Sequence, residues 1–505
     1  MHRNATTRLA PLMACLVLAG CQLQPAGQQP REPTAGIDRA DLSGKVDEQW
    51  FVILLNGEQI GWGHQGEERI QRDGERLLVT RQQIHTSIER GGDITDQQLE
   101  LESTTTAAGE LREFSQSQTS GPSTTTVTGR RVAEGLRIRR GETTTTIPWN
   151  PDDGGFFSVT RSLRQQPLRP GESRTVRELT PQLLKASDIT LTALQMESIV
   201  TPGGVKQLLK VQRSDPLPTG ELISWMWIDR QGTVHAARTE GIELWQFLAT
   251  REQAKQPLVR TGNDLLSSMM VPVDRPLENA RQTRQVLYRL HLERPVSQPL
   301  CNDSSQSVTR LDRHTFQVDV HPPGPTSALD MKPREPTDEQ IAASTMIQSG
   351  DAAIIRQAKQ VLPDTKDPWQ LALALEKHVH ALIDQKNYSH AFATARDVLE
   401  SRQGDCTEHA VLLAALCRAR DIPTRIAVGL VYVPGDSPGY GYHMWNEVWI
   451  GDRWIGLDAM AGRGRVAADR IKILDTDLGD GEAHLALSSL LLWIGQGRLE
   501  ILSAR

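Results

Sequence analysis

The stretch that decides the fold reads GDCTEHA over residues 404–410 and runs directly into the apolar segment VLLAALC over residues 411–417. Asp405 is a good helix N-cap, and Glu408 three residues later completes a capping box, so a helix is expected to begin here. Cys406 then lies in the first turn, where the helix dipole and the free backbone N–H groups favour a thiolate. The same N–H groups can bind a developing oxyanion. The stretch therefore predicts a helix that carries a nucleophilic cysteine at its N-terminus.

A base and an orienting acid follow further along the chain. His443 opens the period-two segment HMWNEVW, and Asp458 ends the next strand-like segment, RWIGLD. Gly451-Asp452 between them is a hairpin turn signal, so His443 and Asp458 are expected to be neighbours on paired strands. The order nucleophile, base and orienting acid predicts acyl transfer through a thioester at Cys406.

These segments together resemble the transglutaminase-like superfamily. The matching motifs, in chain order, are GDC with Ala410, DIPTR at 421–425, HMWNEV at 443–448 and WIGLD at 454–458. One departure is Asp421, which stands where the family usually has glycine, and this change is expected to affect only the turn.

The resemblance implies a papain-like α+β domain over residues 336–505. It also implies that Cys406 is the nucleophile, that His443 is the base and that Asp458 orients the imidazole, with no cofactor and no metal. The predicted fold class of the whole chain is α+β: an N-terminal antiparallel β-rich region followed by this C-terminal domain.

Several neighbouring residues have structural interpretations that compete with functional ones. His409, one turn after Cys406, could form a metal site with Cys406, His443 and Asp458, but no second Cys/His pair at ligand spacing supports it. Cys417 is interpreted as a small core residue. The remaining interpretations are core or groove walls for Trp445, Trp449 and Trp454, an ion pair between Glu447 and Arg425, and a second oxyanion donor at Gln403 or Tyr442.

The beginning of the chain is typical of an export signal. Residues 1–20 combine a basic start with the apolar stretch LAPLMACLVLAG, which is too short to span a bilayer. Its ending, LAGC, resembles the bacterial lipobox, which implies cleavage before Cys21 and a stable anchor made of several acyl chains on that cysteine. Residues 21–45 are rich in Gln, Pro and Gly and predict a flexible tether. The expected location is the cell envelope, lipid-anchored after export; Gln22 favours the outer membrane if the host has one.

The middle of the chain is dominated by strand signals. Residues 46–265 contain Thr-rich and alternating runs separated by turn signals such as Asn56-Gly57, so we expect a large antiparallel sheet with one wet face. Such a sheet resembles the half-barrels of lipoprotein carriers, while a rigid spacer or a partner-docking sheet is the simpler interpretation. Residues 266–335 predict a smaller β unit followed by a Pro-rich linker.

Composition limits the classes of function. The chain has 505 residues, with 56 Lys and Arg against 62 Asp and Glu, and no long basic run, which argues against nucleic acid as a partner. A charged fraction of 23% and a mean hydropathy of −0.41 exclude a polytopic membrane protein. Cys15 leaves with the signal segment and Cys21 would be acylated, which leaves Cys301, Cys406 and Cys417 in the mature fold, so at least one thiol should be free.

The resulting prediction is a membrane-anchored cysteine enzyme that acts on peptide or amide carbonyls, with a peptide or protein as substrate. Water would resolve the acyl-enzyme in a peptidase or deamidase, and an amine would resolve it in a cross-linking enzyme; the residues leave both open. The alternative is a non-catalytic envelope lipoprotein that keeps the fold and binds a peptide or partner. Substrate and oligomeric state stay open.

Overall fold

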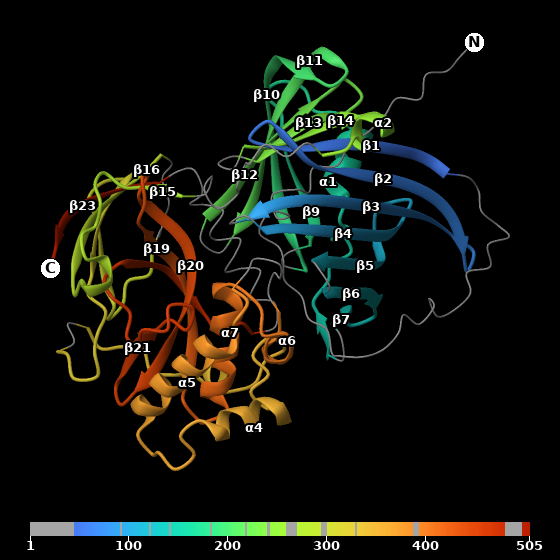
Figure 1. Ribbon diagram of the computed structural model, residues 1–505. Coiled ribbons are helices and arrows are strands. Elements are labelled where there is room, and N and C mark those ends of the chain that lie inside the picture. The colour runs from blue at the N-terminus through green and yellow to red at the C-terminus, as the bar shows by residue number, and fades with distance from the viewer. Residues whose placement is uncertain are drawn as a thin grey trace, which may run out of the picture. The chain divides into compact units, whose positions relative to one another are not determined.

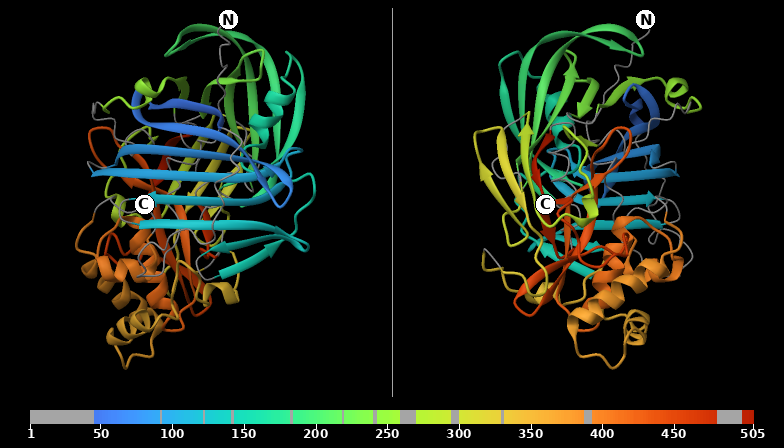
Figure 2. Two further views of the ribbon diagram at one scale, coloured as in Figure 1. Left: turned by 90° about the vertical axis from the view of Figure 1, so that its right-hand side faces the viewer. Right: turned by 60° about the vertical axis from the view of Figure 1, so that its left-hand side comes forward.

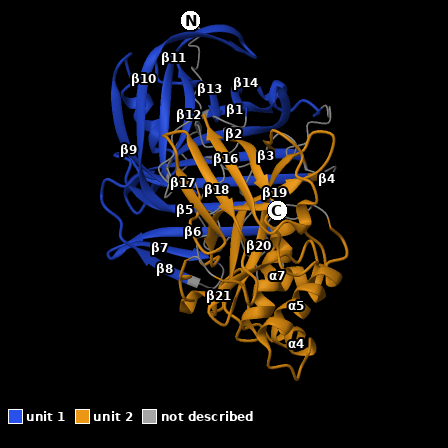
Figure 3. Ribbon diagram, turned by 90° about the vertical axis from the view of Figure 1, so that its left-hand side faces the viewer, with its two compact units in different colours: residues 1–88, 95–216, 221–263 blue, residues 89–94, 217–220, 264–505 orange. Residues whose placement is uncertain are grey.

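The computed structural model describes residues 45–90, 93–120, 123–140, 143–181, 184–217, 220–239, 243–258, 270–293, 300–328, 331–386, 393–479 and 497–505. The predicted signal segment, Cys21 and nearly all of the predicted tether lie outside these residues. The chain forms two compact units: unit 1 comprises residues 1–88, 95–216 and 221–263, and unit 2 comprises residues 89–94, 217–220 and 264–505 (Figure 3). No helix in the described ranges has the length and apolarity needed to cross a bilayer.

A single antiparallel sheet of 14 strands accounts for nearly all of the described part of unit 1 (Figure 1). Its order is β8-β7-β6-β5-β4-β3-β2-β1-β14-β13-β12-β11-β10-β9, so almost every strand pairs with its neighbour in sequence. Figure 2 shows the first strands, coloured blue to teal, lying side by side. The strands are β1 (Lys45–Leu55), β2 (Glu58–Arg72), β3 (Glu75–Arg90), β4 (Asp93–Thr106), β5 (Leu111–Ser120), β6 (Ser123–Val132), β7 (Gly135–Arg140), β8 (Thr143–Ile147), β9 (Ser173–Thr180), β10 (Lys185–Thr201), β11 (Gly204–Leu217), β12 (Gly220–Ile228), β13 (Val234–Thr239) and β14 (Leu244–Ala249). Two helices accompany them, α1 (Ser158–Gln165) and α2 (Arg251–Ala254).

Tight turns join the first strands as the sequence predicts. Asn56 and Gly57 have φ values of 51° and 85°, and Asp73 and Gly74 have φ values of 52° and 78°, the left-handed geometry that two-residue hairpins require. Along β2 buried residues alternate with more exposed ones, so the expected sheet with one buried face is confirmed.

The buried face of the sheet is unusually polar at one place. Gln49, Gln65 and Gln82 lie opposite one another on β1, β2 and β3, and each is at most 3% exposed. The side-chain amide of Gln82 donates to the Gln65 oxygen at 3.5 Å. Burying three amides is favourable only when they find hydrogen-bond partners, so this row suits polar neighbours better than an acyl chain.

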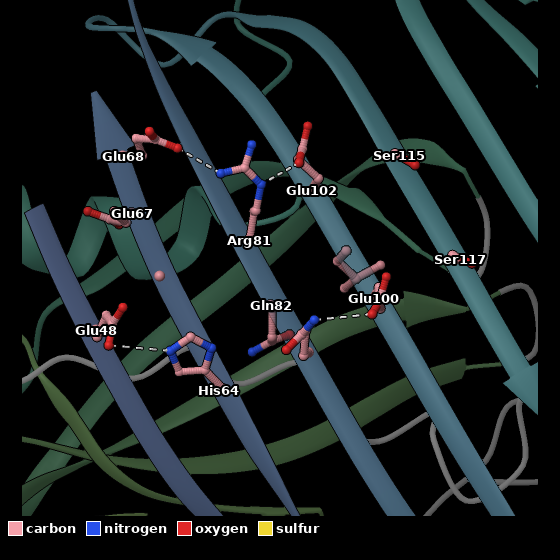
Figure 4. Close-up of a pocket in the computed structure, with 13 residues that line it drawn as sticks. Glu48, His64, Glu67, Glu68, Arg81, Gln82, Glu100, Glu102, Ser115 and Ser117 are labelled. Carbon is pink, nitrogen blue, oxygen red and sulfur yellow. Dashed lines mark hydrogen bonds and ion pairs between the residues drawn. The ribbon is translucent and has the colours of Figure 1, made fainter. Parts of the chain in front are cut away.

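A groove of about 440 Å³ lies on the opposite face, across strands β1 to β5 (Figure 4). Arg81 crosses it, with Nη1 at 2.8 Å from Glu68 and Nε at 2.6 Å from Glu102. Glu48 and Glu100 add two further carboxylates to the lining. The groove is therefore acidic, with more carboxylates than Arg81 can neutralise.

Unit 2 contains two sheets and a group of helices (Figure 1). In the five-stranded sheet the order is β15-β20-β19-β22, with β21 paired to β20, and in the four-stranded sheet it is β17-β18-β16-β23. The strands are β15 (Val271–Pro272), β16 (Val286–Leu292), β17 (Gln306–Arg310), β18 (Thr315–Val320), β19 (Thr424–Val433), β20 (Gly439–Ile450), β21 (Arg453–Leu457), β22 (Arg470–Thr476) and β23 (Gly497–Ala504). The α-helices are α4 (Ala352–Gln360), α5 (Pro368–Leu382), α6 (Ala395–Ser401) and α7 (Cys406–Arg418), and two 3-10 helices are η2 (Ala280–Gln282) and η3 (Asp338–Gln340).

Helix α7 forms the centre of unit 2. It packs against β19 and β20 on one side and against α4, α5 and α6 on the others. Every residue from Thr407 to Arg418 is buried, so this helix is enclosed on all sides. The predicted α+β class is confirmed, and the domain boundaries drawn from the sequence stay predictions.

The helix boundaries follow the caps read from the sequence. Asp405 accepts a hydrogen bond from Thr407 N, and Glu408 completes the predicted capping box. Asp367 caps α5 with Pro368 at its first position, also as predicted. Asp421 lies in the turn after α7 with φ at 59°, the left-handed region that favours glycine; that its replacement of glycine affects only this turn stays a prediction.

Candidate active site

Cys406 is the first residue of α7, directly after its N-cap, and its side chain is partly exposed. The Glu408 carboxyl, which is fully buried, accepts hydrogen bonds from Asp405 N and from Ala393 N, each at 3.0 Å. Burial and the neighbouring Asp405 carboxylate raise the pKa of Glu408 well above its usual value. Burial and Asp405 therefore oppose a negative charge on the Glu408 carboxyl at the start of α7.

His443 and Asp458 meet as expected. His443 lies on β20, Asp458 follows β21, and Gly451-Asp452 forms the turn between the two strands. The Nε2 atom of His443 lies 2.8 Å from Oδ2 of Asp458. The His443 ring also hydrogen-bonds the side chain of Cys406. Because Nε2 faces Asp458, Nδ1 is the ring nitrogen left for the thiol.

The charges of this site favour an ion pair. Burial alone lowers the pKa of His443, but the Asp458 carboxylate and the contact with Cys406 outweigh it and raise this pKa to about 10. Burial opposes ionisation of Asp458 as well, yet the nearby His443 and Arg470 hold the pKa of Asp458 well below its usual range. At neutral pH the imidazolium therefore faces a carboxylate on one side and the cysteine on the other.

Arg470 is a site residue that the sequence does not reveal. It begins β22, and its Nη2 donates to Oδ2 of Asp458 at 2.6 Å, while Nη1 contacts Asp469. Oδ1 of Asp458 accepts from the backbone N–H groups of Met460 and Ala461 at 3.1 and 3.2 Å. Both oxygens are thus held in place, and Arg470 is a positioning residue for Asp458. No local motif marks it, because it reaches the site only through the pairing of β19 with β22.

Gly429 on β19 lies between the strand that carries His443 and the strand that carries Arg470. A Cβ atom at Gly429 would lie 2.1 Å from the backbone oxygen of Ile471, so β22 would have to move. We expect Gly429→Ala to cost about 1–3 kcal/mol in the free energy of unfolding and to slow reaction of Cys406. Urea unfolding and thiol alkylation would measure both effects.

Gly441→Ala is the matched control, because its Cβ would meet only side-chain atoms, at 3.3 Å or more. Equal effects of Gly429→Ala and Gly441→Ala would contradict the expectation.

The other predicted residues have structural roles or stay predictions. Cys417 is fully buried, and burial raises its pKa to about 12, as suits a core residue. The Trp445 ring stacks on His443, with centroids 6.4 Å apart and planes 18° apart. Tyr442 directs its side chain to the face of β20 opposite His443, because side chains alternate along a strand. Gln403 remains the predicted second oxyanion donor.

His409 is held in one tautomer inside unit 2. Its Nδ1 lies 2.6 Å from the backbone oxygen of Asp405, which can only accept, so Nδ1 carries the proton. Burial is the main reason that the pKa of His409 is lowered to about 4, and the positive charge of Lys386 acts in the same direction. His409 is therefore neutral at pH 7, and one of its two possible metal-binding nitrogens is already used.

A buried ion network lies under the same sheet. Glu447 contacts Arg425 at 2.7 Å, as predicted, and Lys472 Nζ at 2.9 Å. Asp303 precedes β17 and Asp475 lies near the end of β22. Each of them contacts both Arg425 and Lys472, which completes the network. Lys472 is 1% exposed, and although burial opposes its charge, Asp303 and Glu447 raise its pKa above the usual value.

Within the described residues, Cys301, Asp303 and Asp475 form one group whose side-chain atoms are close enough to share a metal ion. Lys472 already lies against both carboxylates, so its ammonium offsets part of their negative charge. Burial raises the pKa of Cys301 to about 12, which opposes the thiolate that a metal would require. All three cysteines of the described residues are free thiols.

A cysteine at a helix N-terminus, a histidine and an aspartate joined in this order are the groups that cysteine acyl-transfer chemistry uses. Residues 355–459 match the transglutaminase-like superfamily, so unit 2 contains a transglutaminase-like domain. No curated protein matches the chain.

Comparison with solved structures gives distant similarities. A candidate cysteine protease from Cytophaga hutchinsonii is 18% identical over 38% of this chain and 79% of its own, with a TM-score of 0.27. A candidate protease from Parabacteroides distasonis is 10% identical over 54% of this chain and 63% of its own, with a TM-score of 0.20. A β-barrel-like protein of unknown function from Brucella abortus is 8% identical over 40% of this chain and 95% of its own, with a TM-score of 0.30.

Proposed function

We propose that unit 2 is a cysteine acyl-transfer enzyme that attacks peptide or amide carbonyls. The observation that carries this proposal is the contact of His443 with Cys406 on one side and with Asp458, at 2.8 Å, on the other. A hydrogen-bonded thiol, imidazole and carboxylate are the groups that such chemistry needs. The match of residues 355–459 to the transglutaminase-like superfamily supports the same function.

In the proposed reaction, the Cys406 thiolate adds to the substrate carbonyl, and backbone N–H groups at the start of α7 bind the oxyanion. His443 gives its proton to the leaving amine, and the C–N bond breaks to leave a thioester. His443 then takes a proton from the group that attacks the thioester. Water at this step yields an acid, and an amine yields a new amide. Asp458, held by Arg470, keeps the imidazole in the orientation for both transfers.

Reactivity of Cys406 tests this proposal. We expect an iodoacetamide-type probe to label Cys406 readily at pH 5 to 6, while Cys301 and Cys417 label slowly, because burial raises the pKa of both to about 12. Peptide mapping by mass spectrometry would measure the three rates, with Cys406→Ser as the control. Equal, slow labelling of all three cysteines would overturn the proposal.

The nature of the second step can be tested with the same protein. Peptide amides would be incubated with and without a fluorescent primary amine. Release of a free acid supports a peptidase or deamidase, and incorporation of the amine supports cross-linking.

The proposed location is the cell envelope, with the chain anchored by acylation of Cys21. The support is the lipobox-like ending LAGC of the apolar segment. Mass spectrometry of the mature N-terminus is expected to find acylated Cys21. A free N-terminus at Gln22 would refute the anchor.

The alternative is a binding protein without catalysis, and the acidic groove of unit 1 is the observation that favours it. In that case the partner would be recognised by the sheet, and Cys406 would not need to be reactive. A silent Cys406 in the alkylation experiment, with a folded protein, would support this second function.

A further inference from the structure

Lys386 follows helix α5 and lies next to the proposed active site. The preceding residue, Gln385, forms a parallel bridge with Gln403, and its carbonyl accepts a hydrogen bond from Gly404 N at 3.1 Å. This pairing holds the backbone at Lys386 beside the segment that leads into Cys406.

The ammonium of Lys386 is close to the loop that begins at Asp458. Its Nζ lies 3.1 Å from Nδ1 of His380, and the same Nδ1 lies 2.9 Å from the backbone oxygen of Ala459. The His380 ring also packs against Gly462, where a Cβ atom would approach it to 2.4 Å. His380 thus lies between Lys386 and the residues directly after Asp458.

The hydrogen bonds of Lys386 leave it available to another partner. Nδ1 of His380 can either donate to the Ala459 oxygen or accept from Lys386, but a single ring nitrogen cannot do both. When it donates to Ala459, Lys386 keeps the His380 carbonyl as its hydrogen-bond acceptor among the described residues, at 3.4 Å. No carboxylate in the described part of unit 2 lies within ion-pair distance of Lys386.

Other charges around the site are already paired. His443 and Arg470 both contact Asp458, so the positive charges of these two side chains are largely offset. Lys386 is exposed, and its charge acts on both Asp458 and His409. An anion that reaches Cys406 would therefore meet a cation that is not yet neutralised.

We propose that Lys386 binds a carboxylate of the substrate close to the carbonyl that Cys406 attacks, so that the preferred substrates are peptides with an acidic side chain or a free chain end at this position. This inference rests on the proposed function and deepens it, because it names the substrate class. Lysine suits this role, since its ammonium is a mobile point charge that a carboxylate can approach from several directions.

Two alkylating reagents that differ only in charge test the role of Lys386. Iodoacetate carries a carboxylate and iodoacetamide does not, so the ratio of their rates at Cys406 reports on a nearby cation. We expect Lys386→Gln to lower this ratio about fourfold at low salt, the effect of one charge at about 5 Å in a water-like medium. Lys386→Arg should keep the ratio, and salt should reduce it in the wild type.

Lys377→Gln is the matched control, because Lys377 is exposed on α5 and carries the same charge. It should leave the ratio at the wild-type value. An unchanged ratio in Lys386→Gln would overturn the inference. Slow reaction of Cys406 with both reagents would overturn the proposed function instead. The ratio of the two rates, compared between the wild type and Lys386→Gln, would still show whether Lys386 attracts an anion.

Short peptides can then identify the source of the carboxylate. The experiment measures protection of Cys406 from iodoacetamide by Ac-Ala-Ala-Ala with a free acid or amide end, and by Ac-Ala-Glu-Ala-amide or its Gln counterpart. The inference is supported if one acid peptide protects Cys406 better than its neutral counterpart and if this difference is lost in Lys386→Gln. The peptide that protects then identifies the source of the carboxylate as a side chain or a chain end. Equal protection within both pairs would contradict it.

Discussion

Replacing Asp458 by asparagine is expected to slow alkylation of Cys406 about 100-fold at pH 6 and only slightly at pH 9, because below about pH 8 an unassisted cysteine is mostly thiol. Asp458 is a main reason that the pKa of His443 is raised to about 10. Without this carboxylate the pKa of His443 falls, the imidazolium is lost at neutral pH, and the thiolate of Cys406 loses its partner. The substitution is therefore expected to lower the alkylation rate of Cys406 at low pH.

The pH dependence separates this effect from simple damage to the fold. A distorted site would slow alkylation at pH 9 as much as at pH 6. Asp452→Asn is the matched control, since Asp452 is exposed at the turn between the same strands and accepts a hydrogen bond from the neighbouring Arg453 at 2.7 Å. A wild-type pH profile in Asp458→Asn would show that the ion pair does not control Cys406.

Replacing Lys472 by methionine is expected to lower the free energy of unfolding of unit 2 by about 3–5 kcal/mol, the usual cost of removing one partner from a buried ion pair. Lys472 contacts Asp303, Glu447 and Asp475, and without it Arg425 is the one cation among the described residues that contacts all three carboxylates. Pulsed alkylation of Cys417 over a urea series measures this loss, because Cys417 is fully buried in unit 2.

A second substitution shows whether charge is the cause. Lys472→Met combined with Asp303→Asn restores the original net charge of the network, so the double variant should recover part of the lost stability. Lys359→Met changes an exposed lysine on α4 and should have almost no effect. Additive losses in the double variant would mean that packing, and not charge, accounts for the cost.

Local signals predict much of unit 2. Asp405 and Glu408 form the cap that the sequence indicates, and the turn at Gly451-Asp452 brings β20 and β21 together. These features depend on residues a few positions apart, so the chemistry of a short segment determines them. Part of the large sheet of unit 1 was predictable for the same reason, because the hairpins at Asn56-Gly57 and Asp73-Gly74 carry their own turn residues.

Long-range pairing explains what the sequence could not reveal. Arg470 reaches Asp458 only because β22 pairs with β19, and nothing near Arg470 in the sequence indicates this pairing. Lys386 is hidden in the same way, since its position depends on a bridge between Gln385 and Gln403. The sequence therefore reveals the residues that would perform the reaction, because they lie in local motifs. It does not reveal the residues that support them, because these reach the site through long-range strand pairing.

The enclosure of α7 has a consequence for the lifetime of the site. Amide hydrogens of a helix that is buried from Thr407 to Arg418 exchange with solvent only when much of unit 2 opens, so α7 should belong to the most slowly exchanging part of the chain. Cys406 is attached to the start of this helix. Brief local openings elsewhere in unit 2 would therefore leave the nucleophile in place, and its working half-life should follow the rate of global unfolding of unit 2.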